Sequence, residues 1–197
     1  MLGKMGKYIG AMLMALLLVS CGGGGSAPRN LDDACALVRE RPSYLAAMRA
    51  SERRWGVPVA VQMATIYQES RFVANARTPH RYALGVLPMG RQSTAYGYSQ
   101  AIDSTWDDYR KATRQRSAKR TRIKDATDFI GWYMNGTTTR LGIAKSDARN
   151  QYLAYHEGRT GYARGTHRSK GWLIQTADKV QSRAQRYDGQ LRSCNKI

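Results

Sequence analysis

Apolar residues recur at helical spacing along most of this chain, and no segment alternates polar and apolar residues as a half-buried strand would. Proline and glycine mark the helix ends: Pro42 and Pro58 each suit a first helical turn, and Gly56 ends the helix between them. The predicted helices cover residues 30–41, 42–55, 58–69, 99–114, 125–141, 146–156 and 169–192. The fold class is therefore mainly α.

The stretch from Arg71 to Gly97 interrupts this pattern. It has no sustained period, and it contains Pro79, Gly85 and Pro88 among its helix-breaking residues. A loop of this length within one compact domain is usually functional. We therefore expect a long loop beside a binding or active site.

The first 20 residues predict an export signal. Lys4 and Lys7 precede an apolar run from Ile9 to Val19, which is shorter than the about 20 residues that cross a bilayer. The sequence Leu-Val-Ser-Cys at residues 18–21 resembles a bacterial lipobox. This resemblance implies cleavage before Cys21 and lipidation of its thiol. An uncleaved signal anchor is the alternative, and the short apolar run argues against it.

Three segments follow from this interpretation: a signal peptide at residues 1–20, a lipidated Cys and flexible Gly-rich tether at 21–29, and a folded domain at 30–197. Gly22, not Asp, follows the cysteine. Among lipoproteins this implies an outer-membrane protein that faces the periplasm and is held to the membrane by its lipid anchor.

Lipidation of Cys21 leaves two cysteines, Cys35 and Cys194, near opposite ends of the domain. In an oxidising compartment such a pair predicts a disulfide bond, with two free thiols as the alternative. The histidines, at positions 80, 156 and 167, are too scattered to predict a metal site.

Glu69 is the first candidate catalytic residue. It ends an apolar helix and follows Thr65 and Ile66 by four and three residues, so its side chain begins on the buried stripe. A carboxyl group against apolar surface has a raised pKa and can act as a proton donor near neutral pH. The alternative is a solvated or capping glutamate at a helix end.

Two further segments offer ligand-binding chemistry. In residues 95–101 a glycine lies between Tyr96 and Tyr98, which permits close backbone approach, and Gln100 supplies a donor and an acceptor. In residues 154–158, Tyr155 offers a hydroxyl that could lie near Glu69. The alternatives are a tight turn before a helix for the first and a helix end capped by glycine for the second.

In this order and spacing the three segments resemble the lytic transglycosylases, whose SLT domain is lysozyme-like. A Glu-Ser helix end, a Gly-Leu-Met-Gln type motif and an Ala-Tyr-Asn-x-Gly motif are matched by residues 69–70, 97–100 and 154–158. The resemblance covers about residues 45–190. The middle motif keeps only its glycine and glutamine, and His156 stands where asparagine is usual.

The resemblance implies cleavage of the MurNAc-GlcNAc β-1,4 bond of peptidoglycan with formation of 1,6-anhydro-MurNAc ends, without a cofactor. Glu69 would act as acid and then as base. Tyr155 would orient it or polarise the departing group. The implied substrate contacts are Ser70, Tyr98, Gln100 and His156.

The distribution of acidic residues favours a mechanism with a single carboxylate. Ordinary glycosidases use two, but residues 71–102 contain no Asp or Glu, and Asp103 falls inside the next predicted helix. Glu157, within the last motif, is the alternative second acid.

The net charge of +18 indicates an acidic partner, which could be nucleic acid, an anionic membrane or an acidic polymer. Residues 110–124 hold eight Lys and Arg and no acid. They form either a solvated surface or a region attracted to peptidoglycan carboxylates or anionic lipids. We expect the tryptophans, at positions 55, 106, 132 and 172, to belong to the core.

Three alternative functions remain. Export argues against a nucleic-acid-binding protein, and Glu69 argues against a non-catalytic wall-binding lipoprotein. A lysozyme-type hydrolase would differ in the end group of its product. We expect a monomer that binds peptidoglycan and no nucleic acid.

Overall fold

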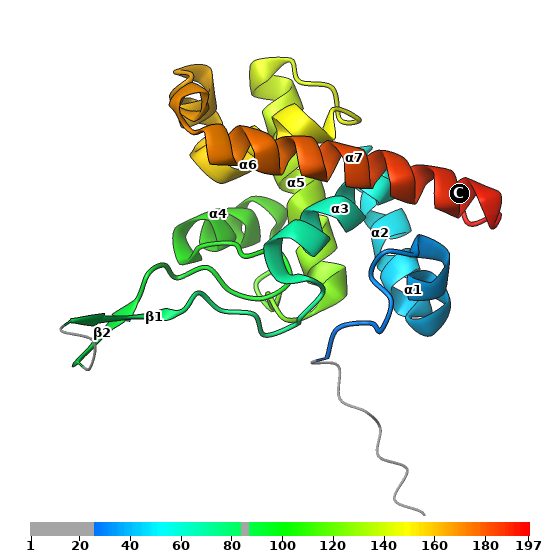
Figure 1. Cartoon of the computed structure of the whole chain (residues 1–197), viewed down its shortest axis with the longest axis horizontal. Helices are drawn as coiled ribbons and strands as arrows, with labels where there is room; N and C mark the ends of the chain where they lie inside the picture. The colour runs from blue at the N-terminus through cyan, green and yellow to red at the C-terminus, as the bar shows by residue number, and fades with distance from the viewer. Residues whose placement is uncertain (1–25, 84–86) are drawn as a thin grey trace, which may run out of the picture.

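The computed structural model describes residues 26–83 and 87–197, which form a helical body with a β-hairpin projecting from it (Figure 1). The predicted signal peptide, Cys21 and the first part of the tether lie outside the described residues. The helices are α1 (Ala34–Glu40), α2 (Pro42–Trp55), α3 (Val59–Ser70), α4 (Asp103–Thr113), α5 (Ile123–Leu141), α6 (Ala148–Ala163), the 3-10 helix η1 (Thr166–Ser169) and α7 (Gly171–Ser193). The fold is mainly α, as predicted. None of the described helices combines the length and the apolar character needed to cross a membrane.

Helix α3 is enclosed by the other helices. Nine of its twelve residues are buried, and a helix that is apolar on most sides needs partners all around it. It packs against α7 and also contacts α2, α5 and α6, while α5 packs against α2. Phe129, Ile130 and Met134 of α5 are fully buried in the same core. This packing fixes the carboxyl end of α3, where Glu69 lies.

Several helix boundaries differ from those predicted: α4, for example, begins at Asp103 and not at residue 99, and the geometry explains the differences at α1 and α6. The first helix begins at Ala34, because the Asn30 side chain accepts hydrogen bonds from the amides of Asp32 and Asp33 and holds a turn, and the Asp33 carboxylate caps the helix instead. Helix α6 continues beyond His156. Gly158, at φ 73° and ψ 153°, interrupts its helical geometry, and the helix then resumes.

The long loop contains an antiparallel hairpin of β1 (His80–Ala83) and β2 (Leu87–Arg91). The sequence predicts only a long loop here and does not reveal these strands. Strands this short, one containing Pro88, carry too few residues to show alternation. The hairpin projects from the body at the lower left of Figure 1.

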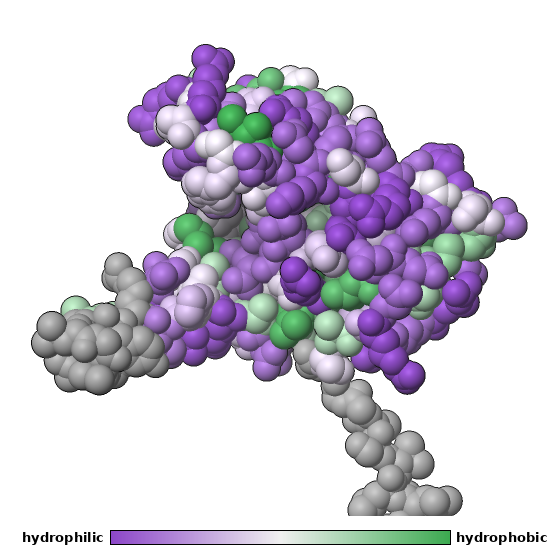
Figure 2. Space-filling view, in the orientation of Figure 1, coloured by the Kyte–Doolittle hydropathy of each residue, from purple (hydrophilic) through white to green (hydrophobic). Residues whose placement is uncertain are grey.

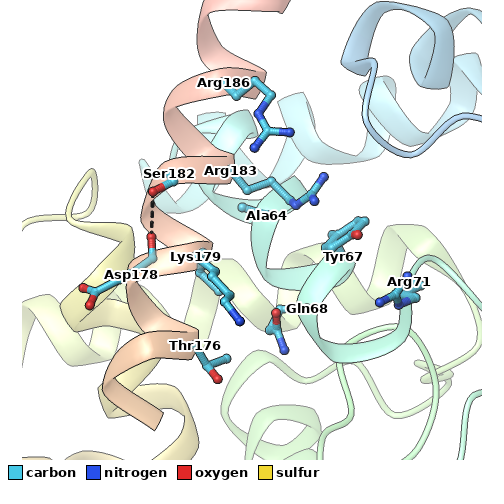
Figure 3. A pocket seen from close by; sticks show the side chains of 11 residues that line it. Ala64, Tyr67, Gln68, Arg71, Thr176, Asp178, Lys179, Ser182, Arg183 and Arg186 are labelled. Carbon is cyan, nitrogen blue, oxygen red and sulfur yellow. Dashed lines mark hydrogen bonds between the residues drawn. The ribbon is translucent and has the colours of Figure 1, made fainter. Parts of the chain in front are cut away.

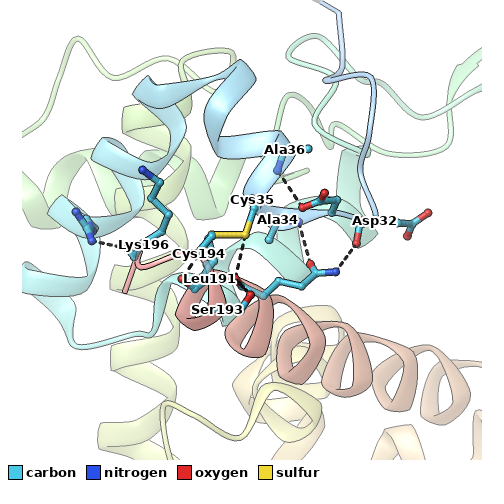
Figure 4. The surroundings of a disulfide bond; sticks show 11 residues. Asp32, Ala34, Cys35, Ala36, Leu191, Ser193, Cys194 and Lys196 are labelled. Carbon is cyan, nitrogen blue, oxygen red and sulfur yellow. Dashed lines mark hydrogen bonds between the residues drawn. A yellow bond between two sulfur atoms is a disulfide. The ribbon is translucent and has the colours of Figure 1, made fainter.

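Cys35 and Cys194 form the expected disulfide, which joins α1 to the end of α7 across a Cα–Cα distance of 6.4 Å (Figure 4). Gln190 strengthens the junction: its side-chain oxygen accepts from the Ala34 amide at 2.9 Å, and its nitrogen donates to the Asp32 carbonyl at 3.1 Å. The two ends of the described domain are thus tied together.

We expect replacement of both cysteines by serine to lower the free energy of unfolding by about 3 kcal/mol, because the unfolded chain gains conformational freedom when so long a loop is opened. Thermal unfolding followed by circular dichroism tests this, and reduced wild type is the control. Equal melting temperatures for oxidised wild type, reduced wild type and the double variant would contradict the expectation.

Candidate active site

A cavity of about 510 Å³ brings residues of all three sequence motifs together. Its wall is formed by the end of α3, the loop before α4, one side of α5 and the middle of α6. Among the predicted site residues it contains Glu69, Gln100, Tyr155 and His156, and Glu157 lines it as well. Apolar Phe129 and polar groups thus face the same space, as is typical of a ligand site.

Glu69 lies among buried residues, and one side of it faces this cavity. It is partly exposed on the side of the cavity, and its helix neighbours Ile66 and Ser70 are buried. Burial raises the pKa of the Glu69 carboxyl from 4.5 to about 7, although a hydrogen bond with Tyr152 acts in the opposite direction. Near neutral pH the group therefore exists in both protonated and ionised forms.

The tyrosine hydroxyl that bonds to Glu69 belongs to Tyr152, one helical turn before Tyr155. Tyr152 is buried, and its burial raises the pKa of its hydroxyl, which keeps it protonated as a donor. Sequence analysis missed this residue. Its spacing of three from Tyr155 places it on the same side of α6, and that was the available signal.

Tyr155 lines the cavity, but its hydroxyl donates to the Ser99 carbonyl at 2.6 Å. Burial is the main cause that raises the pKa of this hydroxyl, and the nearby Glu69 carboxylate adds to it. The ring of Tyr133 packs edge-on against it, with 5.1 Å between ring centroids. Tyr155 thus connects α6 to the loop beside Glu69.

Gln100 is held firmly at the cavity wall. Its side-chain nitrogen donates to the carbonyls of Ala76 and Gly97, at 2.9 and 2.8 Å. Its backbone has φ 47°, in the left-handed region. The side chain therefore braces the loop while lining the cavity, a double role that the motif did not reveal.

Two predicted substrate contacts are wrong in their placement. Tyr98 is 3% exposed, and its hydroxyl shares a 2.8 Å hydrogen bond with that of Tyr44 in the core. Ser70 is also buried, and its hydroxyl donates to the Tyr98 carbonyl at 2.8 Å. Neither lines the cavity. Both side chains point inward: the Ser70 hydroxyl fastens the end of α3 to the loop, and the Tyr98 hydroxyl fastens the loop to Tyr44 of α2.

His156 lines the cavity, and Trp172 lies against this histidine. His156 is exposed, and its ring meets that of Trp172 edge-on with 5.2 Å between centroids. Trp172 is 59% exposed, so the prediction that it belongs to the core is wrong. It lies at the start of α7, one residue before the fully buried Leu173. Trp106 is buried in the core, and Trp55 and Trp132 are partly buried against it.

Glu157 differs from Glu69 in its electrostatic surroundings. The Lys170 ammonium lies 2.8 and 2.9 Å from its two oxygens, Thr166 donates to it, and its side chain is 4% exposed. The hydrogen bond from Lys170 is the main cause that lowers the pKa of Glu157 to about 2. The two carboxyl groups of the cavity thus have pKa values that lie far apart, with only Glu69 able to exchange a proton near neutral pH.

The basic stretch at 110–124 contributes directly to the architecture of the cavity loop. Arg120 pairs with Asp103 at 2.6 Å and donates to the carbonyls of Thr94 and Ala101. Arg122 pairs with buried Asp125 at 2.6 Å. These arginines hold loops in place, a structural role that neither interpretation of the basic stretch predicted.

Within residues 26–83 and 87–197, no group of three or more His, Cys, Asp and Glu side chains is arranged to hold a metal ion.

Comparison with protein families matches residues 9–194, nearly the whole chain, to a family described as Transglycosylase SLT domain. No curated protein matches the chain.

Proposed function

Since the chain belongs to the transglycosylase SLT domain family, we propose that it is a peptidoglycan lytic transglycosylase with Glu69 as its catalytic residue. The family and the mainly α, lysozyme-like architecture support peptidoglycan as the substrate. The observation that carries the proposal is a carboxyl group with a pKa of about 7 at the wall of a cavity of about 510 Å³.

The proposed reaction cleaves the β-1,4 bond between MurNAc and GlcNAc. Protonated Glu69 donates its proton to the glycosidic oxygen as the bond from this oxygen to the anomeric carbon breaks. The Glu69 carboxylate then takes the proton of the 6-hydroxyl, whose oxygen forms a new bond to the anomeric carbon. The product is a 1,6-anhydro ring, no water is consumed, and Glu69 is protonated again.

The surroundings of Glu69 suit both steps. A pKa near the working pH makes the acid and base forms similarly accessible. The nucleophile belongs to the substrate itself, which gives it a high effective concentration. We assign to the N-acetyl group of the substrate the assistance that a second carboxylate provides in other glycosidases.

Glu157 raises the one alternative that the cavity itself suggests, a lysozyme-type hydrolase with two carboxylates. Both oxygens of its carboxylate are already bonded, by Lys170 and Thr166, and these bonds lower its affinity for a proton, which argues against a role as base. The end group of the product distinguishes the two reactions.

Mass spectrometry of the fragments released from purified sacculi tests the proposal. A transglycosylase releases 1,6-anhydro ends, which are lighter by one water than reducing ends. Predominantly reducing ends would establish hydrolysis and overturn the proposed reaction.

The Tyr152→Phe variant should shift the pH dependence of activity upward. The hydrogen bond from Tyr152 stabilises the Glu69 carboxylate, so its loss raises the pKa of Glu69 further above 7. Because the first step needs the protonated form, the alkaline decline of kcat/KM should move to higher pH. Tyr155→Phe is the control, since that hydroxyl bonds to Ser99. An unchanged alkaline limb in Tyr152→Phe would contradict this expectation.

We further propose that the mature protein is a monomeric outer-membrane lipoprotein that faces the periplasm. The lipobox-like residues 18–21 and Gly22 support this. Cys21→Ser should abolish labelling by radioactive palmitate and release the protein from the membrane fraction. Undiminished labelling would exclude Cys21 as the anchor.

A further inference from the structure

A second cavity of about 490 Å³ lies between α3 and α7 (Figure 3). Four cationic side chains line it: Arg71 next to the end of α3, and Lys179, Arg183 and Arg186 of α7. Asp178 is the one carboxylate in its wall. We call this cavity the α3–α7 basic pocket. Figure 2 shows that hydrophilic residues cover most of the face on which α7 lies.

The positive charge of this pocket is only partly neutralised. Asp178 already pairs with Arg149 at 2.6 Å, and Arg183 pairs with Asp32 at 2.7 Å. Arg71 and Lys179 form no salt bridge with any carboxylate in the described part of the chain. The pocket therefore attracts a negatively charged ligand.

The pocket also has an aromatic wall, formed by the ring of Tyr67. The Arg183 guanidinium lies over the Tyr67 ring, 3.4 Å from its centroid. Stacking fixes this guanidinium, which pairs with Asp32, so that Tyr67 and Arg183 form a rigid wall of the pocket. In Figure 3, Tyr67 and Gln68 of α3 and Lys179 and Arg183 of α7 line the same pocket.

The pocket adjoins the candidate active site through two helices. On α3, Gln68 lines the pocket and the next residue, Glu69, lines the active-site cavity. On α7, Trp172, Thr176 and Lys179 follow one another at spacings of four and three, on one side of the helix. From Trp172, beside His156, to Lys179 the helix rises about 10 Å.

We propose that the α3–α7 basic pocket binds the carboxylates of the stem peptide carried by the glycan strand under cleavage. This proposal rests on the proposed function, because peptidoglycan is the polymer that presents such peptides next to the scissile bond. An extended peptide of four residues spans about 13 Å, which reaches from the cavity edge to Lys179. A concave pocket with an aromatic wall suits a peptide, whereas a membrane surface is flat.

Binding of a free stem peptide tests the pocket without any cleavage. The probe is the tripeptide L-Ala-γ-D-Glu-meso-diaminopimelate, titrated calorimetrically into the protein at low salt. In the variant Arg71→Gln/Lys179→Gln we expect Kd to rise at least about tenfold, because the loss of even one of the two charged hydrogen bonds has about that effect. Added salt should weaken binding to wild type by screening.

The control variant is Lys111→Gln/Arg114→Gln. Like the pocket variant, it replaces one lysine within a helix and one arginine directly after a helix. The two arginines also share a left-handed backbone, with φ 57° at Arg114 and 49° at Arg71. Lys111 and Arg114 line a separate basic hollow. The Kd of the tripeptide for this control should match that for wild type. If the control weakened binding as much as the pocket variant does, binding would depend on the overall charge of the protein, and the proposal would be wrong.

The remaining outcomes separate this proposal from the proposed function. The pocket variant should lose activity on intact sacculi but retain it on glycan strands stripped of peptide by an amidase. If the tripeptide does not bind while Arg71→Gln/Lys179→Gln reduces binding to phosphatidylglycerol vesicles, the pocket is a lipid site and the proposal is wrong. Failure of the proposed function would show instead as full activity of Glu69→Gln, which leaves peptide binding unaffected.

Discussion

The Glu69→Gln variant is expected to solubilise purified cell walls at a rate at least about a thousandfold below wild type. Glutamine has nearly the shape of glutamate but cannot donate a proton to the glycosidic oxygen, nor take one from the 6-hydroxyl. The cavity offers no substitute, because Glu157 is bound to Lys170 and stays ionised. Both proposed proton transfers are therefore lost together.

The same variant should be more stable than wild type at alkaline pH. The pKa of Glu69 is about 7 in the folded protein against 4.5 in the unfolded chain. Between these values the folded state binds more protons, so wild-type stability falls as pH rises across this window. Glutamine does not ionise, so the variant avoids the cost of a buried negative charge. The difference in melting temperature between Glu69→Gln and wild type should therefore grow from about pH 5 to about pH 8.

Zymograms and turbidity assays on sacculi measure the loss of activity. Glu40→Gln, the same change at an exposed site of α1, is the control and should retain wild-type activity. The activity of this control and the stability of both variants together distinguish a catalytic defect from a folding defect. A Glu69→Gln variant that clears sacculi as fast as the control would remove Glu69 from the mechanism.

The Gly97→Ala variant is expected to lose about 3 kcal/mol of stability and most of its activity. Gly97 has φ 79°, and a Cβ there would meet the Arg120 carbonyl oxygen at 2.2 Å. The obstacle is backbone, whose oxygen also accepts from the Tyr98 amide at 3.2 Å, so it cannot move without breaking the loop. Gln100, which donates to the Gly97 carbonyl, would be displaced from the cavity wall.

Gly142→Ala distinguishes this steric cost from the cost of the left-handed backbone alone. Gly142 has φ 70° at the end of α5, and nothing lies within 4 Å of a Cβ built there. Its loss of stability should be about 1 kcal/mol, without an effect on activity. Equal urea denaturation midpoints for the two variants would contradict the close approach at Gly97.

Sequence analysis identified four residues that the structure brings to one cavity: Glu69, Gln100, Tyr155 and His156. These residues could be predicted because each lies in a short motif with a recognisable spacing. Tyr152 was missed because the sequence around a tyrosine in a helix does not indicate which group its hydroxyl will contact. That partner comes from α3, more than 80 residues away in the sequence.

The errors have a common cause. Ser70 and Tyr98 belong to the motifs but point into the core, because the hydroxyl of Ser70 bonds to the loop backbone and that of Tyr98 bonds to Tyr44 of α2. Trp172 is apolar enough for a core position, yet it is 59% exposed, while Leu173 beside it is the residue that turns into the core. Residue type and spacing place a side chain on an element, but the neighbours of that element decide which way it faces.

Local signals in the sequence determined the helices, the glycines that end α2 and α5, and the two cysteines available for pairing, because each depends on nearby residues or on residue chemistry alone. Only the tertiary structure decided the pKa of Glu69, the partner of its carboxyl group and the basic pocket between α3 and α7. These properties arise from desolvation and from charges brought together by packing, and neither quantity exists until distant segments meet.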